Sequence, residues 1–397
     1  MPNSLITRVL RRILPLCLIL AALRPTALIP GLFLGGRCAA AHEELTGAQF
    51  LAEFKTRVAA RDSGAFVRLD DSDVECCFKA LIEALLAEDL HAAGVEIDAL
   101  DACGVRYRTL ALADTPADDP IFGFMETAFP GDPDYRGWGA ALVRPRARTR
   151  IVYQAPHVRA DLYTEDIALH ALLRDAGAWM ALFAGTHRYA NGDADGDGDE
   201  DSDAAHDTEN LFHALTAYLA RRGEARGGTP WVVQYHGAAD RDTEPDVVAS
   251  GGAPAPGCPL VSIDDAVDAA GNIRSGVCGW SEEKEGEDGD YLLCVSSNVQ
   301  YALMRGMGIG DGFLHLEIER AARADYHAGS GPGHDGVLDL LDAVAEILGG
   351  ASPPAPRPLS VRISFHPPSV PTPPGHLNDE GLDYGCREEP FHLYGWR

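Results

Sequence analysis

The sequence predicts a mixed α/β fold, in which one doubly wound sheet is flanked by helices. From Gly137 onward, short apolar runs typical of buried strands alternate with amphipathic helical stretches. Several of these runs end in histidine, arginine or carboxylate side chains, as expected where sites gather at the carboxyl ends of strands. The chain has 397 residues, 46 % of them hydrophobic, which is enough for one large domain with smaller attachments.

The N-terminal segment has the pattern of an export signal. Three arginines in the first twelve residues precede the apolar run Ile13–Leu23, and Ala39–Ala41 offers a small-residue cleavage site. Arg24 and nearby prolines disfavour a spanning helix, although a retained anchor is the alternative. We therefore expect a signal peptide over 1–41, a periplasmic or extracellular location, and no stable membrane insertion after cleavage.

The next segment, 42–135, is expected to be a small helical region. Alanine and leucine recur at helical spacing in Glu43–Ala59 and Val74–Leu90. Thr115–Tyr135 is rich in proline, aspartate and glycine and is expected to be a loop.

Residues 136–350 are expected to form the α/β domain. Helices are expected from Thr164, as the capping residue, to about Asp175, and at Glu209–Arg222 and Asp335–Leu348. Strands are expected at Gly139–Arg144, Thr149–Gln154, Trp179–Ala184, Trp231–Tyr235, Tyr291–Val295 and Gly312–Glu319. Residues 351–397 are expected to be a proline-rich linker and a short irregular tail with some strand, including Leu359–Phe365.

The formal net charge of −27 excludes nucleic acid as a partner, because its phosphates would be repelled. Part of the excess acid lies in Asp193–Asp203. Asp193, Asp195 and Asp197 match the start of a calcium loop, but the twelfth position is Ala204 instead of a bidentate glutamate. A solvated acidic insertion is the favoured interpretation, and weak calcium binding is the alternative.

Nine cysteines are present, without the CxxC spacing of a zinc ribbon. Export would permit disulfides, and Cys258–Cys278 is a candidate bridge across a loop rich in glycine and proline.

Two strand ends deliver histidines together with carboxylates. The strand before His157 ends at that residue, Asp161 follows four residues later, and Glu165 is the rival ligand one helical turn further. The strand Trp231–Tyr235 ends in His236. Two histidines and one carboxylate are a ligand set typical of catalytic zinc, with a fourth position open for water.

Further polar residues follow or lie on the other strands. Glu317 is a candidate general acid/base. The alternative is that it lies on the solvated acidic face of an edge strand and has no catalytic role. Arg188 is a candidate for holding a substrate carboxylate or polarising a carbonyl, and His187 lies beside it. Asn298 and Gln300 either line the pocket or cap a turn.

From Gly137 to about Asp325 the chain resembles the zinc carboxypeptidase superfamily. It is most similar to poly-γ-glutamate hydrolase-like and N-formylglutamate amidohydrolase-like proteins. The pieces that carry the resemblance are Gly137-Trp138-Gly139, Ala155-Pro156-His157 with Asp161 and Thr164-Glu165, Gly185-Thr186-His187-Arg188, Tyr235-His236-Gly237 and Leu314-His315-Leu316-Glu317.

The resemblance implies zinc held by His157, by Asp161 or Glu165, and by His236, with Glu317 as general acid/base. It also implies cleavage of an amide bond in a small-molecule or peptide substrate, with a substrate carboxylate nearby. The family places a glutamate three residues after the first histidine, where this chain has Ala160.

The tail is similar to the opening of malectin-like modules, which are associated with carbohydrate binding. Phe365-His366-Pro367, Tyr384-Gly385-Cys386-Arg387 and Tyr394-Gly395-Trp396 carry this likeness. The leading expectation for the whole chain is an exported zinc-dependent amidohydrolase. The alternative is a non-catalytic exported binding protein, associated with calcium or glycans, on a degenerate hydrolase scaffold.

Overall fold

The computed structural model describes residues 42–350, except for 195, 197, 226–229, 242, 252–257, 279–292 and 296, and the backbone of four short strands in the tail. These residues belong to one compact unit, Ala39–Arg397. Within this described part, none of the helices combines the length and the apolar character needed to cross a bilayer. The expected signal segment 1–41 lies outside the described residues.

The core of the structure is a mixed sheet, which confirms the predicted fold class. Its strand order is β1-β2-β3-β4-β6-β5-β7-β10-β8-β9. The four central strands β6, β5, β7 and β10 run parallel, and β4 and β8 flank them antiparallel. The strands are β1 (Glu43–Leu45), β2 (Tyr107–Leu112), β3 (Phe122–Glu126), β4 (Ala140–Val143), β5 (Ile151–Ala155), β6 (Met180–Phe183), β7 (Trp231–Ala238), β8 (Val247–Ser250), β9 (Ser275–Val277) and β10 (Phe313–Glu319).

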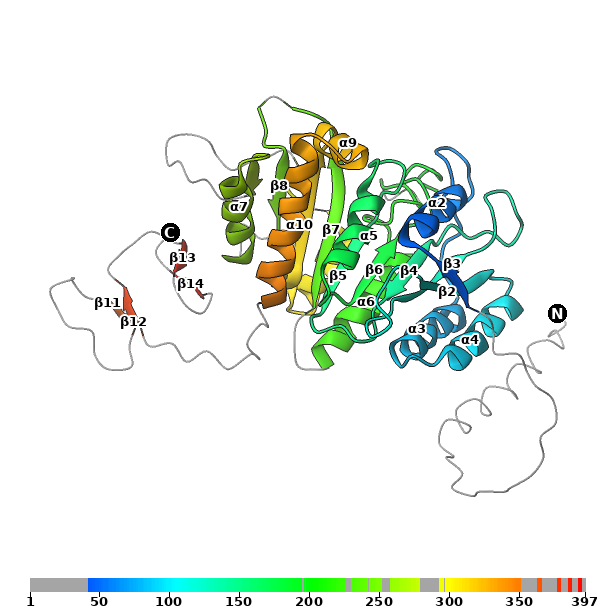
Figure 1. Cartoon of the computed structure of the whole chain (residues 1–397). Helices are drawn as coiled ribbons and strands as arrows, with labels where there is room; N and C mark the ends of the chain where they lie inside the picture. The colour runs from blue at the N-terminus through cyan, green and yellow to red at the C-terminus, as the bar shows by residue number, and fades with distance from the viewer. Residues whose placement is uncertain are drawn as a thin grey trace, which may run out of the picture. The chain divides into compact units, whose positions relative to one another are not determined.

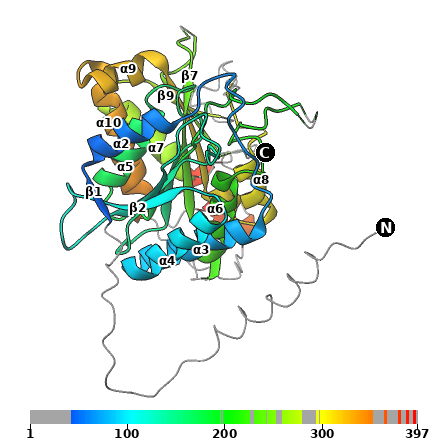
Figure 2. The same cartoon turned by 90° about the vertical axis from the view of Figure 1, so that its right-hand side faces the viewer.

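Helices cover both faces of this sheet (Figures 1 and 2). One layer consists of α2 (Gly47–Arg57), α5 (Thr164–Arg174), α7 (Cys258–Ala270), α9 (Arg320–Ala328) and α10 (Pro332–Gly350). The other consists of α3 (Ser72–Leu86), α4 (Leu90–Ala102), α6 (Leu211–Ala225) and α8 (Val299–Gly306), with a short 3-10 turn at Gly310–Gly312.

Alternation along the central strands decides which side chain meets which layer. Tyr153 and Tyr235 pack in the core beneath α5 and α10, whereas Val152 packs in the core beneath α6. The central strands are buried on both faces, which explains their nearly continuous apolar sequences. Buried polar side chains on the α6 side of β5, β7 and β10 depart from this apolar pattern, and such departures are typical of a functional site.

The N-terminal region 42–135 is more than a helical attachment, because β1, β2 and β3 join the main sheet. The helix expected at Glu43–Ala59 begins only at Gly47, after β1, and Thr46 caps it in a reciprocal pair with Gln49. Strand β3 lies within the stretch that was expected to be a loop, and all five of its residues are buried.

Two expectations near the cysteines are wrong. Residues 293–295, the described part of the strand expected at Tyr291–Val295, form no strand. Cys278 is bonded to Cys294 rather than to Cys258, and the Cα atoms of the bonded pair are 5.7 Å apart. In the tail, β11 (Ile363–Phe365) pairs with β12 (Leu377–Asp379), and β13 (Gly385–Arg387) pairs with β14 (His392–Tyr394). The malectin-like likeness stays a prediction.

Candidate active site

The loop after β5 curls into a single turn that brings His157 and Asp161 together. The Asp161 N–H donates to the His157 carbonyl at 2.9 Å, so side chains four residues apart lie on the same side. His157 Nδ1 is therefore 3.0 Å from Asp161 Oδ2. The Thr164 hydroxyl donates to the Asp161 carbonyl at 2.9 Å and holds the turn. Thr164 is the first residue of α5, and the expected N-cap position is occupied by Tyr163, in a left-handed conformation with φ 75°.

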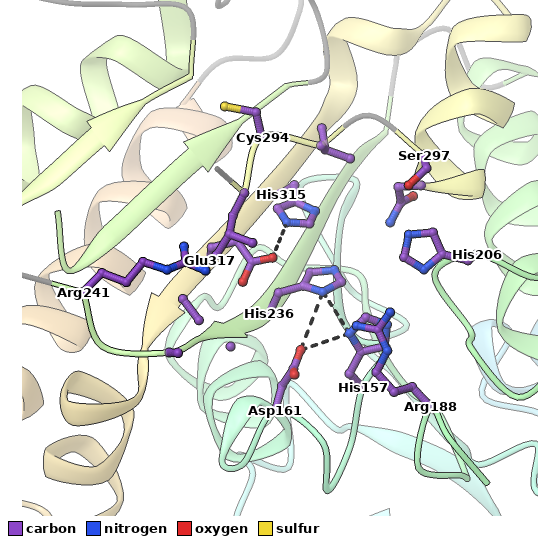
Figure 3. Close-up of a pocket in the computed structure, with 16 residues that line it drawn as sticks. His157, Asp161, Arg188, His206, His236, Arg241, Cys294, Ser297, His315 and Glu317 are labelled. Carbon is purple, nitrogen blue, oxygen red and sulfur yellow. Dashed lines mark hydrogen bonds and ion pairs between the residues drawn. The ribbon is translucent and has the colours of Figure 1, made fainter. Parts of the chain in front are cut away.

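His236 reaches the same place from β7. This strand continues to Ala238, so His236 lies inside it rather than after it. His236 Nδ1 is 3.1 Å from His157 Nδ1 and 3.7 Å from Asp161 Oδ2 (Figure 3). Tetrahedral zinc with bonds of about 2.0–2.1 Å requires ligand atoms roughly 3.3 Å apart. The three atoms form a triangle of that size, so the donor set fits zinc in both chemistry and spacing.

Protonation of the two histidines differs. Burial alone would lower the pKa of His157, but the carboxylates of Asp203 and Asp161 raise it to about 9. Burial, with help from His315 and His157, lowers the pKa of His236 well below 6.5. Burial would raise the pKa of Asp161, but His157 and the Gly237 N–H lower it. His157 thus carries one proton more than a neutral imidazole, beside the Asp161 carboxylate, and a divalent cation would replace that extra proton.

Asp203, which the sequence analysis did not identify, lies on the far side of the His157 ring. Its Oδ1 is 2.8 Å from His157 Nε2 and accepts the Ala205 N–H at 3.0 Å. Its Oδ2 is 2.6 Å from Arg188 Nη2 and 3.1 Å from His206 Nδ1. Burial opposes ionisation, but His157, His206 and Arg188 hold the pKa of Asp203 far below its usual range. This carboxylate fixes which ring nitrogen of His157 faces Asp161.

Strand β10 supplies Glu317 beside His236, its register partner on β7. Glu317 Oε1 is 3.0 Å from His315 Nε2, and the His315 ring stacks on His236 with centroids 4.1 Å apart. One ligand atom from each of His236, His315 and Glu317 lies within 4.8 Å of the others. Glu317 thus lies beside His236 and His315, in the wall of the cavity described next.

A cavity of about 290 Å³ opens over these groups. His157, Asp161, His236 and Glu317 lie in its wall, together with the predicted Arg188 and Asn298. The remaining polar wall consists of residues that the sequence analysis did not single out for the site: His206, Arg241, Ser297 and His315. Figure 3 shows Glu317 and Arg188 on opposite sides of His236.

Three predicted site residues lie outside the lining of this cavity. Glu165 Oε1 is 2.9 Å from Lys55 Nζ, and the structure does not bring it to the two histidines. Between the two rival carboxylates, only Asp161 faces His157 and His236. His187 accepts the Tyr189 N–H on its Nδ1 at 3.0 Å, within its own turn. Gln300 is fully buried and bonds to the Ala204 carbonyl.

The acidic loop shows no calcium-ligand group in its described part. Asp193 accepts the Gly196 and Gly198 N–H groups at 2.6 and 3.1 Å, so both of its carboxylate oxygens have backbone partners. Asp195 and Asp197 lie outside the described residues. Among the described residues, groups suited to a metal occur only around His157 and His236.

No family model matches the sequence, and no curated protein matches it. Solved structures that are similar include N-formylglutamate amidohydrolase from Ralstonia eutropha JMP134, with 12 % identity, 51 % of this chain and 94 % of that chain covered, and a TM-score of 0.34. A putative metallopeptidase from Shewanella amazonensis SB2B has 13 % identity, coverage of 65 % and 93 %, and a TM-score of 0.33. N-acetylmuramyl-L-alanine amidase from Mycobacterium smegmatis has 12 % identity, coverage of 51 % and 97 %, and a TM-score of 0.26.

Proposed function

We propose that this protein is a zinc-dependent hydrolase that cleaves an amide bond in a peptide or N-acyl amino acid. The observation that carries the proposal is the triangle of His157 Nδ1, Asp161 Oδ2 and His236 Nδ1, with edges of 3.0, 3.1 and 3.7 Å. Two histidines and one carboxylate leave a fourth position for a reactant. The three residues line a cavity whose wall also contains the Glu317 carboxylate and the arginines Arg188 and Arg241.

Zinc, when bound, supplies Lewis acidity toward a carbonyl oxygen and toward water. Glu317 takes the proton from the attacking water and delivers it to the departing nitrogen. His315 holds Oε1 of Glu317 at 3.0 Å and so fixes the orientation of this carboxylate. The second carboxylate required for amide hydrolysis is thus distinct from the one that holds the metal.

An anionic substrate is supported by the two arginines of the cavity wall. Arg188 is positioned by Asp203 at 2.6 Å, and Arg241 by Glu244 at 2.8 Å. Arginine in such a fixed position suits a substrate carboxylate or a developing negative charge on the carbonyl oxygen. The chain as a whole carries a net charge of −27, so the arginines make the cavity wall locally more basic than the rest of the protein.

Metal content tests the proposal first. Purified protein should contain about one zinc per chain, and His157→Ala and His236→Ala should lose it while remaining folded. His187→Ala is the matched control, because this histidine lies outside the cavity and should leave the zinc content unchanged. A folded wild type that takes up no zinc, and whose stability a chelator does not change, would overturn the proposal.

Turnover tests the role of Glu317. With a library of peptides and N-acyl amino acids, Glu317→Gln should lower kcat roughly 10²- to 10⁴-fold while zinc remains bound. Glu88→Gln is the control, since Glu88 pairs with Arg146 at 2.8 Å and does not line the cavity. The absence of turnover by wild type with bound zinc would reject the enzymatic reading and favour a binding protein.

Export remains part of the proposal. The Cys278–Cys294 disulfide supports an oxidising compartment. Mass spectrometry of the protein isolated from its native host should find a mature N-terminus near residue 42. An uncleaved chain that remains in the cytoplasm would contradict this.

A further inference from the structure

A row of buried amide side chains lies beneath His236, where an apolar core would be expected. Gln154 and Gln234 are register partners on β5 and β7, and Gln300 and Asn298 reach them from the start of α8. All four are buried, three of them with no exposed surface. Gln234 is two residues before His236, so both side chains leave β7 on the same face.

The direction of the Gln234 amide is fixed from two sides. Gln300 Nε2 donates to the Ala204 carbonyl at 2.8 Å, so Gln300 Oε1 is left to accept from Gln234 Nε2 at 3.2 Å. Asn298 Oδ1 accepts the Gln300 and Tyr301 N–H groups, both at 3.0 Å, as the N-cap of α8. Asn298 Nδ2 is therefore a donor, and it bonds to Gln234 Oε1 at 2.7 Å. The Ala204 carbonyl can only accept, and the Gln300 and Tyr301 N–H groups can only donate. These backbone groups therefore fix the directions of the Gln300 and Asn298 amides.

The consequence reaches His236. Gln234 Oε1, fixed as an acceptor, lies 3.1 Å from His236 Nε2. The proton of the neutral ring must therefore be on Nε2, and the lone pair on Nδ1. That lone pair faces His157 Nδ1 at 3.1 Å and Asp161 Oδ2 at 3.7 Å.

We propose that Gln234, oriented by Asn298 and Gln300, sets the tautomer of His236 and so presents Nδ1 as a preformed metal ligand. The metal part of this proposal rests on the proposed function. The two histidines are then oriented differently, His157 by the carboxylate of Asp203 and His236 by a neutral amide. An amide orients the ring without adding another buried charge, which would be costly at this depth. Gln234 is a positioning residue, since it acts through His236.

The tautomer is measurable in the metal-free wild-type protein. Long-range ¹H–¹⁵N correlation spectra of ¹⁵N-histidine protein, with His236 assigned by a His236→Asn variant, should show a protonated Nε2 and an unprotonated Nδ1. A protonated Nδ1 would overturn the proposal. This measurement depends neither on bound zinc nor on the folding of a network variant.

Zinc affinity tests the consequence for the metal site. Gln234→Leu should weaken zinc binding roughly 10- to 100-fold in competition with a chromogenic chelator. Gln154→Leu is the matched control: it removes an equally buried amide that accepts from Gln234 Nε2 at 2.8 Å, but it leaves the Asn298 and Gln300 bonds that fix the direction of the Gln234 amide. The zinc affinity of Gln154→Leu should be within about 3-fold of the wild-type value, a smaller change than that expected when a residue that orients a metal ligand is lost.

The outcomes separate the two proposals. Equal zinc affinity in Gln234→Leu and wild type, with both folded by thermal melting, would overturn the role of Gln234. If the Gln234 variant does not fold, the wild-type spectrum still decides the tautomer. Protonated Nε2 in a wild type that takes up no zinc would support the tautomer assignment and reject the proposed metal site.

Discussion

Asp203 contacts His157 on the side of the ring opposite Asp161, with Oδ1 of Asp203 2.8 Å from Nε2 of His157. The same carboxylate holds Arg188 at 2.6 Å through its other oxygen. One buried side chain therefore orients both a candidate metal ligand and a candidate substrate-binding arginine. Under the proposed function, one substitution at Asp203 should therefore change both metal affinity and substrate affinity.

Asp203→Asn should weaken zinc binding roughly 10- to 100-fold, because an uncharged amide orients His157 less strongly. It should also raise the KM for an anionic substrate, since Arg188 loses its ionic partner. Asp201→Asn is the control: Asp201 is buried in the same loop but pairs with Arg68 at 2.9 Å. Wild-type zinc affinity in Asp203→Asn, measured by chelator competition, would contradict this role.

The stability of the zinc-free protein should depend on the protonation of His157. The pKa of His157 is raised from 6.5 to about 9 in the folded state. A raised folded-state pKa gives a stabilising contribution that is complete below pH 6.5 and is lost as the pH rises through about 9. Under the proposed function zinc would replace this proton, so zinc affinity should rise over the same interval. In urea unfolding, the free energy of unfolding of the zinc-free wild type should fall as the pH rises across this range, and His157→Gln should lack this dependence. The same pH dependence in the variant and the wild type would contradict the role of His157.

Arg323 connects three segments that carry the site: the end of β7, the end of β10 and the loop before α5. Its guanidinium donates to the Ile318 carbonyl at 2.9 Å, the Ala238 carbonyl at 3.1 Å and the Leu162 carbonyl. A Cβ at Gly237 would lie 2.5 Å from this group, so any side chain there would displace the guanidinium from these bonds. Lysine cannot reproduce the three-way fork, and Arg323→Lys should cost roughly 2–3 kcal/mol in urea unfolding.

Arg174→Lys provides the comparison for Arg323→Lys. Arg174 pairs with Asp342 at 2.6 Å on the surface, where both side chains are largely exposed. Its replacement should cost less than about 1 kcal/mol. If Arg323→Lys and Arg174→Lys lowered the free energy of unfolding by similar amounts, the buried hydrogen bonds of Arg323 would contribute no more than a surface ion pair.

The disulfide between Cys278 and Cys294 fixes one wall of the cavity, because Leu293, Cys294 and Val295 line it. Replacing both cysteines with serine should lower the free energy of unfolding by roughly 3 kcal/mol, as expected for a closed loop of about this length. It should also lower kcat/KM. Cys103→Ser, at an exposed free cysteine, should change neither quantity. Unchanged melting of the double variant would refute the stabilising role.

Local pattern in the sequence was sufficient for much of the fold and for part of the site. Apolar runs marked β5, β6, β7 and β10, and their polar ends pointed to His157, His236 and Glu317. The spacing of four residues favoured Asp161 without deciding against Glu165. Tertiary contacts separate these two carboxylates, since Glu165 pairs with Lys55 whereas Asp161 contacts His157 and His236.

The parts that the sequence did not reveal depend on contacts between distant segments. Asp203 lies in an acidic run in which nothing local distinguishes it from its neighbours, and its partner His157 is on another loop. Gln234 lies two residues before His236 in the sequence, but the sequence does not show that Asn298 and Gln300 hydrogen-bond to its amide. Strand β3 was missed because its ends are rich in loop-forming residues, while pairing with β2 and β4 determines its conformation.

The order of the central strands also bears on how the chain would acquire the proposed metal ion. The ligand triangle requires β5 and β7 to be paired, and Glu317 joins it only when β10 has added beside β7. Pairings between such distant segments form slowly, because the loops between them must close first. During refolding, tight zinc uptake should therefore follow most of the recovery of helix signal. The ion would then act as a chemical reporter that the last central strands have docked.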